Sequence, residues 1–321
     1  MNPTVTRAID YADGTNESPD DYPTLDAKIE KAVAVTEAAL DAYENPAVMW
    51  TGGKDSTLVL YFVTRVAERY GHDVPPAIVL DHYQHFDDLL AFVDRWGDRW
   101  DVDVHVAAND DVGEYVRAND LDPGDPISVA ELNEANRAEV RETLDHGDDA
   151  FPFLLDTYVG NHLLKTVALN DALEEHDIDG IFSGIRWDEQ EARADETFFS
   201  ARHDPEVSPP HDRVQPILQF RERDVWDALW THAVPDAVEA FPDDGHVPRS
   251  RDDLPEGVSR EDIPISPKYF DGFRSLGSEV STERAADEPA WLQDLDGTTE
   301  RAGRAQDKED LMERLRDLGY M

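Results

Sequence analysis

The pattern of apolar and polar positions along the chain predicts strands that alternate with helices. Short apolar runs, of the length that a buried strand needs, occupy residues 46–50, 77–80, 102–106 and 180–183. Apolar positions recur at intervals of three and four, as on one face of a helix, over residues 25–43, 57–71, 86–100 and 158–176. Alternating strands and helices form a parallel sheet with helices on both faces. We therefore predict an α/β fold with a doubly wound, mostly parallel sheet and a mixed C-terminal region.

The same pattern divides the chain into three regions. Residues 1–24 are polar, contain Pro and Gly, and are expected to form a flexible N-terminal arm. Residues 25–220 hold the predicted strands and helices, interrupted at 109–150 by an acidic insertion in which we expect one helix. Residues 221–321 follow a mixed pattern and are expected to form a region that contacts substrate or a partner.

The charge balance limits the partners that the protein can have. The 321 residues include 72 acidic and 29 basic ones, for a formal net charge of −43, and only six of the bases are lysines. Such a surface repels the phosphates of DNA and RNA, so no nucleic-acid partner is expected. Self-repulsion of this size is screened by concentrated salt, and an acidic, lysine-poor surface is typical of the cytoplasmic proteins of extreme halophiles. We expect a protein of a high-salt cytosol.

Two features that the sequence lacks exclude further partners and kinds of site. No apolar stretch approaches the roughly 20 residues that span a bilayer, and the first residues lack the apolar core of a secretion signal. We therefore expect a cytoplasmic protein with no membrane partner. The chain also contains no cysteine. Disulfides, thiolate zinc sites, iron–sulfur clusters and cysteine nucleophiles are excluded by that fact.

A six-residue loop between a predicted strand and a predicted helix has the composition of a phosphate-binding site. Its two glycines let backbone N–H groups turn inward, the following helix directs the positive end of its dipole to the same place, and Lys54 adds a full charge. The glycines are adjacent, unlike those of a Walker A loop. The alternative is a plain turn that leads into a capped helix. The residues predicted to hold phosphate are Thr51, Gly52, Gly53, Lys54, Asp55 and Ser56.

This loop resembles the Ser-Gly-Gly-x-Asp-Ser pyrophosphate loop of the N-type ATP pyrophosphatases, the superfamily that includes the phosphoadenosine-phosphosulfate (PAPS) reductases. The resemblance implies an ATP pyrophosphatase domain with an adenine nucleotide alpha hydrolase-like fold over residues 25–220. The loop would then hold the pyrophosphate part of ATP. Two branches of the superfamily are relevant here: the PAPS reductases, and the ATP-splitting small subunit of heterodimeric sulfate adenylyltransferase.

A second segment, residues 183–193, resembles the Gly-x-Arg-x-Asp-Glu-x-x-x-Arg signature of the adenylyltransferase small subunit. The resemblance implies that its glycine contacts the nucleotide, that its arginines bind sulfate or the ATP phosphates during catalysis, and that its acids position Mg²⁺ or orient the arginines. These residues are Gly184, Arg186, Asp188, Glu189 and Arg193. Without the resemblance, the same spacing equally fits a solvent-exposed helix with a salt bridge between Glu189 and Arg193.

Further matches lie outside these two segments. Asp81 ends the second predicted strand, where the family places an acid that helps seat the adenosine. Arg274 begins an Arg-x-Leu-Gly turn like that of the family, which implies another arginine for the substrate anion. Residues 298–304 and 318–321 resemble the C-terminal tail of the adenylyltransferase small subunit. His82 and His85 lie among acids, and we interpret them as surface histidines rather than metal ligands.

The missing cysteines separate the two branches. PAPS reductases use a C-terminal cysteine as nucleophile, whereas Ser278 follows the Arg-x-Leu-Gly turn here, so thiol-based reduction is excluded. The resemblance to the other branch implies Mg²⁺-dependent adenylyl transfer from ATP to sulfate, giving adenosine 5′-phosphosulfate and pyrophosphate. In that reaction Lys54 would stabilise the departing pyrophosphate.

The resemblance also implies a partner. The family has a GTP-hydrolysing large subunit, which would be a separate chain, because this sequence contains no GxxxxGK[ST] motif. A homo-oligomer is the other possibility. Two alternative functions stay open: adenylyl transfer to another small oxyanion, carboxylate or carbonyl acceptor, and non-catalytic binding of adenylyl-sulfates.

Overall fold

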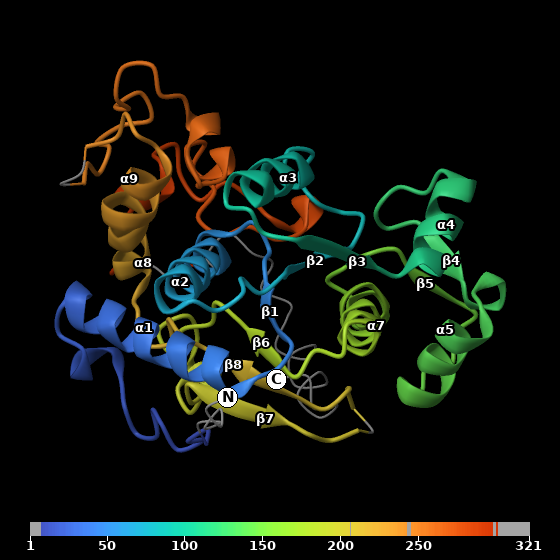
Figure 1. Ribbon diagram of the computed structural model, residues 1–321. Helices are drawn as coiled ribbons and strands as arrows, with labels where there is room; N and C mark the ends of the chain where they lie inside the picture. The colour runs from blue at the N-terminus through green and yellow to red at the C-terminus, as the bar shows by residue number, and fades with distance from the viewer. Residues whose placement is uncertain (1–7, 206, 243–244, 298–299, 301–321) are drawn as a thin grey trace.

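A six-stranded sheet forms the centre of the protein (Figure 1). The structure, a computed structural model, describes residues 8–205, 207–242, 245–297 and 300. Neighbouring strands run parallel except at one edge, where β7 pairs antiparallel with β8. The predicted α/β fold with a mostly parallel sheet is confirmed. In spatial order the strands are β3 (Val104–Ala108), β2 (Ala77–Asp81), β1 (Pro46–Met49), β6 (Gly180–Phe182), β8 (His211–Val214) and β7 (Phe199–Arg202).

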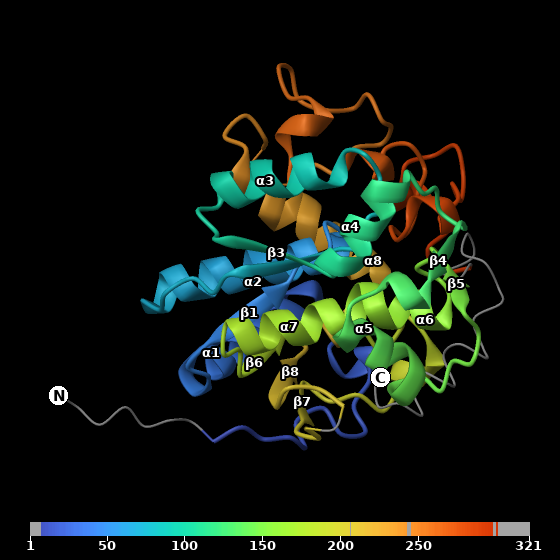
Figure 2. The same ribbon diagram turned by 90° about the vertical axis from the view of Figure 1, so that its right-hand side faces the viewer.

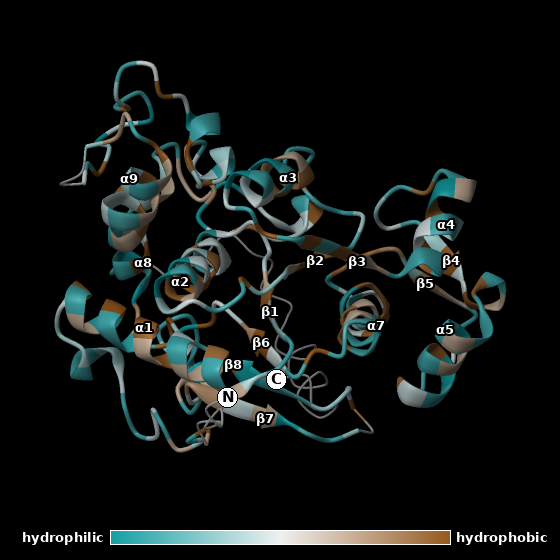
Figure 3. Cartoon of the chain, in the orientation of Figure 1, coloured by the Kyte–Doolittle hydropathy of each residue, from teal (hydrophilic) through white to brown (hydrophobic). Residues whose placement is uncertain are grey.

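Successive residues of the parallel strands point to opposite faces of the sheet, and each face has its own apolar core. On one face, the strand residues Ala47, Ile78 and Ile181 pack with buried residues of α7 (Ala168–Glu175). On the other face, strand residues that include Val48, Val79 and Phe182 pack with residues of α1 (Leu25–Ala42) and α2 (Lys54–Tyr70). The sheet is therefore covered by helices on both faces, and the apolar colouring of Figure 3 follows strands β1, β2 and β3.

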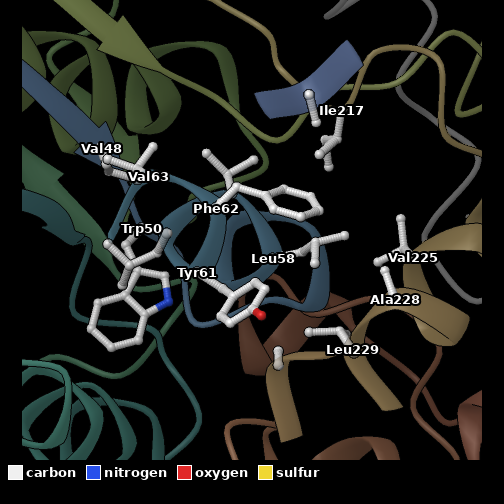
Figure 4. Packing of buried hydrophobic residues seen from close by; sticks show 14 of the residues in the cluster. Val48, Trp50, Leu58, Tyr61, Phe62, Val63, Ile217, Val225, Ala228 and Leu229 are labelled. Atoms are coloured by element: carbon white, nitrogen blue, oxygen red, sulfur yellow. The ribbon is translucent and has the colours of Figure 1, made fainter. Parts of the chain in front are cut away.

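Helix α2 is apolar on nearly all sides because other elements surround it. Residues 56–64 are all buried. Its side chains reach β1 and the helix α8 (Glu222–Ala228), as Figure 4 shows for Val63 and Leu58. Fully burying a side chain of this kind contributes roughly 1.5–3 kcal/mol. The helix ends at Gly71, whose φ of 80° gives the left-handed cap that the sequence predicts. The start of α2 is thereby held firmly against the sheet.

The acidic insertion at 109–150 is more structured than we expected. Instead of one helix it contains α4 (Asp110–Asn119), α5 (Glu134–Ala138) and one of two short paired strands, β4 (Pro126–Ser128) and β5 (Ala150–Pro152). A separate apolar cluster that includes Ile127, Val140 and Phe151 supports these elements. The charge-rich sequence hid this pattern, since the apolar residues are spaced irregularly. In Figure 1 the insertion lies at the side of the molecule opposite α1, and in Figure 2 this side faces the viewer.

Two further predictions need correction. The N-terminal arm is not loose where the structure describes it, because the N–H of Phe198 donates to the carbonyl of Asp13 at 3.0 Å and the Tyr11 hydroxyl donates to Asp212 at 2.7 Å. The third strand begins at Val104, two residues later than the apolar pattern placed it, and β7 was not predicted at all. Its alternating pattern is short and lies beside a proline-rich loop.

The remaining elements are short. The predicted helix at 158–176 is α6 (Tyr158–Asn161), a π-helical stretch (His162–Val167) and α7 in succession. Beyond α8 come another π-helical stretch (Leu229–Ala233), α9 (Val234–Ala237) and mainly irregular chain, while α3 (Leu89–Arg99) follows β2. A third π-helical stretch is Glu139–Thr143, and the 3₁₀ turns are Pro19–Asp21, Val129–Glu131, Glu191–Arg193, Arg260–Asp262, Pro267–Tyr269, Glu279–Ser281 and Ala290–Leu292. Among the described residues, no helix combines the length and the apolar character that a membrane span requires.

Candidate functional site

The predicted phosphate loop lies between the end of β1 and the start of α2. Gly52 has a φ of 68°, and a Cβ at this position would lie 2.3 Å from the side chain of Leu89, so only glycine fits without rearrangement. The hydroxyls of Thr51 and Ser56 lie 3.0 Å apart, and the Thr51 N–H donates to the Ser56 hydroxyl at 3.1 Å. Helix α2 begins at Lys54, whose N–H donates to the Tyr269 hydroxyl at 2.9 Å, while its N-cap residue Gly53 has no side chain to cap it. Its amino end therefore keeps the positive dipole that the phosphate prediction requires.

Segment 183–190, which follows β6, lies directly against this loop. A Cβ on Gly184 would approach the backbone of Asp55 and Ser56 to 2.9 Å, so the glycine permits the close passage. The segment is not helical, and only 1% of Arg186 is exposed. The alternative reading of a solvent-exposed helix is therefore wrong. The structure brings Arg186 and the loop together, as the resemblance implies.

Lys54 and Arg186 are buried side by side among carboxylates. The ammonium of Lys54 lies 3.0 Å from Asp55 and also contacts Glu300. The guanidinium of Arg186 contacts Asp55, and it donates to Asp188 at 2.8 Å and to Glu300 at 2.6 Å. Burial opposes the charge on Lys54, but Asp55 and Glu300 raise its pKa above the usual range. Both cations are therefore fully charged and tightly paired.

Glu300 is the site residue that the sequence did not single out. Its carboxylate bridges Lys54 and Arg186, with one oxygen on each. Burial alone would raise the pKa of Glu300, but Lys54 and then Arg186 bring it below the usual range. Of the tail at 298–321, the structure describes this residue alone. The tail motif was noticed for its resemblance, and its acid gave no separate signal.

The two acids predicted to position Mg²⁺ are both engaged with arginines. Asp188 accepts from Arg186 and from the backbone N–H of Glu222 at 2.8 Å. Glu189 lies 3.5 Å from Arg193. No group of three or more potential metal ligands occurs within the described part of the chain. This arrangement matches the alternative role, orienting the arginines, and Mg²⁺ binding stays a prediction.

Arg274 occupies a different environment from the one predicted. It forms a buried pair with Glu222, at 2.7 Å from its Nη2, and donates to the carbonyls of Asp294 and Leu295. Only 4% of Arg274 is exposed. The pair links the end of the described C-terminal region to α8. These contacts are those of a structural ion pair rather than of an arginine held open for an anion.

The carboxyl end of β2 carries the residues predicted near the adenosine. Asp81 accepts from the backbone N–H of Tyr83 at 2.8 Å. His82 and His85, expected at the surface, are instead largely buried and stack with ring centroids 3.7 Å apart. Burial and the neighbouring His85 lower the pKa of His82 to about 2, so this ring is neutral. The correction follows from the insertion, which covers this end of the sheet.

Comparisons with known proteins point to one superfamily. Residues 128–237 match the phosphoadenosine phosphosulfate reductase domain, a range that contains segment 183–193 but not the phosphate loop. Sulfate adenylyltransferase subunit 2 of a Rhizobium species is 25% identical over 323 residues, covering 90% of this chain and 96% of that protein. Sulfate adenylyltransferase subunit 2 of Mesorhizobium japonicum is 26% identical over 231 residues. This match covers 71% of this chain and only 62% of that relative.

A solved structure shares the fold. The FMN adenylyltransferase of Candida glabrata, solved in complex with FAD and inorganic pyrophosphate, superposes with a TM-score of 0.51. The match covers 90% of this chain and 94% of that one at 14% identity, so it supports the architecture alone. The resemblance inferred from the sequence is confirmed: this chain is similar to the phosphoadenosine phosphosulfate reductase domain and, over most of its length, to sulfate adenylyltransferase subunit 2.

Proposed function

We propose that the protein transfers the adenylyl group of ATP to sulfate, giving adenosine 5′-phosphosulfate and pyrophosphate. The observation that carries the proposal is the carboxylate of Glu300, held between Lys54 and Arg186 at the amino end of α2. Two buried cations and a helix N-terminus favour an anion at this point. A carboxylate of the chain itself occupies that position, and we propose that phosphate oxygens of ATP take its place.

The proposed reaction is an in-line displacement. A sulfate oxygen attacks the α-phosphorus of ATP, a new phosphorus–oxygen bond forms, and the bond to the β-phosphate bridging oxygen breaks. The electron pair leaves with pyrophosphate, whose growing negative charge Lys54 and Arg186 would stabilise. Sulfate is already an anion, so no general base is required. Mg²⁺ would arrive bound to ATP and neutralise part of the phosphate charge.

A partner subunit forms part of the proposal. The relatives carry the name subunit 2, which supports a complex with a larger, separate chain. Formation of a sulfate–phosphate anhydride is strongly uphill, so a GTP-hydrolysing partner would supply the driving force. Removal of pyrophosphate would pull the same equilibrium in the absence of such a partner.

Release of pyrophosphate from ATP tests the activity. The purified chain, in concentrated KCl with Mg²⁺ and a salt-tolerant pyrophosphatase, should release phosphate only when sulfate is added. Lys54→Met should lower this rate about 10²–10³-fold, because the transition state loses one charged donor. Lys31→Met is the matched control, because Lys31 pairs with Asp13 away from the site. Release that depends on a carboxylate instead of sulfate would assign a different acceptor.

A further inference from the structure

We propose that Arg193, Arg202 and Arg213 form the subsite that binds the acceptor oxyanion. The inference rests on the proposed function and names the residues that would hold sulfate while the phosphate loop holds ATP. The ligand class is a small tetrahedral dianion, for which planar guanidinium groups offer paired donors. Of these arginines, only Arg193 was predicted from the sequence.

The antiparallel edge of the sheet brings two of the arginines together. Arg213 on β8 pairs with Ser200 on β7, and Arg202 pairs with His211. Arg213 is also in register with Ile181 on β6, which packs against α7. Paired residues of neighbouring strands point to the same face, and so do residues two apart along one strand. All four edge residues therefore face the α7 side of the sheet.

The side chains of these arginines are partly buried and lack close charged partners. Within the described residues, the Arg213 side chain makes no hydrogen bond or ion pair, and the buried Nε atoms of Arg193 and Arg202 have no hydrogen-bond partner. Their nearest carboxylates are Glu189, at 3.5 Å from Arg193, and Glu196, at 3.8 Å from Arg202. Both distances exceed those of charge-assisted hydrogen bonds. A stronger anion would supply the close partner that the three guanidinium groups lack.

Neutral polar groups of the same region are also without partners. The hydroxyl of Ser200, the Nε2 atom of His211 and the Oε1 atom of Gln215 are buried and make no hydrogen bond. Gln215 is held in place through its amide nitrogen, which donates to the carbonyl of Thr197 at 2.7 Å. Buried polar atoms are normally satisfied, and several unsatisfied ones at one place indicate a ligand.

The charges within the cluster repel one another. Burial, followed by the charge of Arg202, lowers the pKa of Arg213 to about 10; Glu196 opposes the shift in part, and Arg193 adds to it. A dianion placed among the three side chains would remove this repulsion and supply the missing acceptors. In a chain with a net charge of −43, arginines left without close carboxylates stand out, because acidic partners are abundant everywhere else.

Segment 183–193 links the cluster to the phosphate loop. The chain runs from Arg186, in the loop site, to Arg193, and Glu189 acts electrostatically on both arginines. The N–H of Ser183 donates to the carbonyl of Val214 at 2.8 Å, which fixes the end of β8 beside the same segment. The cluster and the loop site are therefore connected through one short segment.

Equilibrium dialysis with radiolabelled sulfate tests the assignment without requiring turnover. The full chain is dialysed in KCl with and without α,β-methylene-ATP, a nucleotide that cannot transfer its adenylyl group. We expect one sulfate per chain in at least one of the two conditions. Arg213→Gln and Arg202→Gln should each weaken that binding at least 10-fold. The matched control Arg260→Gln, at an exposed arginine paired with Glu261, should bind sulfate like the wild type.

The outcomes separate this inference from the proposed function. Equal sulfate binding by Arg213→Gln and the wild type, or no sulfate binding in either condition, would overturn the subsite. Loss of α,β-methylene-ATP binding in Arg213→Gln would also overturn it, since the arginines would then serve the nucleotide. If sulfate binds through the cluster but the wild type releases no pyrophosphate with any partner, the subsite stands and the adenylyl transfer fails.

Discussion

The phosphate loop site and the arginine cluster (Arg193, Arg202 and Arg213) differ in how closely their cations are paired with carboxylates. At the loop, Lys54 and Arg186 meet carboxylates at distances of 3.0 Å or less, including both oxygens of Glu300. In the cluster, three arginines face two carboxylates at 3.5 and 3.8 Å, and buried polar atoms are left over. The loop follows β1, and two of the clustered arginines lie on β7 and β8, at one edge of the same sheet.

The difference indicates how each region meets its ligand. Under the proposed function, ATP at the loop would displace an acid of the chain, so part of the binding free energy would be used to release Glu300. In the cluster no carboxylate is as closely paired, and the cost is already present as partly buried, poorly paired charge. The paired cations of the loop site are stable without a ligand, whereas an anionic ligand would stabilise the crowded arginines of the cluster.

The largest effect should come from a paired arginine. Arg274→Gln leaves Glu222 buried without its ionic partner, which should lower the free energy of unfolding by about 3–5 kcal/mol. Arg213→Gln removes a partly buried charge that has no close partner, and should change the free energy of unfolding by no more than about 1 kcal/mol in sulfate-free buffer. Chemical unfolding of both variants in the same KCl buffer measures the contrast. Similar losses in the two variants would contradict the comparison.

The pH dependence of the free energy of unfolding tests the buried histidine His82, which belongs to neither of these two regions. The pKa of His82 is lowered to about 2 in the folded state, so the unfolded chain binds more protons once the pH falls below about 6.5. Stability should therefore be fully present above that pH. Below it, His82 should remove about 1.4 kcal/mol per pH unit. His82→Asn should flatten this part of the profile, and an unchanged slope would show that the ring is protonated in the fold.

The smallest predicted effect concerns the acid that occupies the loop site. Glu300→Gln keeps the shape of the side chain but removes the charge held between Lys54 and Arg186. The variant should bind ATP a few-fold more tightly, which corresponds to roughly 1 kcal/mol. Isothermal titration with α,β-methylene-ATP measures the affinity. Weaker binding by the variant would mean that Glu300 supports the nucleotide instead of competing with it.

The fold could be predicted from the sequence because its strands are buried on both faces. The inner strands β1, β2 and β6 are short apolar runs, and helices with regular spacing follow β1 and β2. The inner strand β8 contains three polar or charged residues and shows no such run. The phosphate loop was also visible, since its glycines, Lys54 and the helix start are consecutive in the chain. Edge strand β7 was missed because its apolar pattern is short and irregular.

The errors at the site come from contacts between residues far apart in the sequence. Glu300 meets Lys54 across 246 positions, and Arg274 meets Glu222 across 52. Arg202 and Arg213 become neighbours only when β7 folds back on β8. No local pattern records such pairings, so Arg274 was assigned to an anion and two arginines of the cluster were overlooked.

The reverse reaction tests the central claim most directly, because it runs downhill without a partner. The full chain is supplied with adenosine phosphosulfate, pyrophosphate and Mg²⁺ in concentrated KCl, and ATP is measured in quenched samples. We predict ATP formation by the wild type and by Lys31→Met, and a rate lower by about 10²–10³-fold in Lys54→Met. Formation of ATP at the wild-type rate by a folded Lys54→Met variant would contradict the role of the loop. The absence of ATP in every sample, from protein that binds ATP, would contradict the proposed adenylyl transfer to sulfate by this chain.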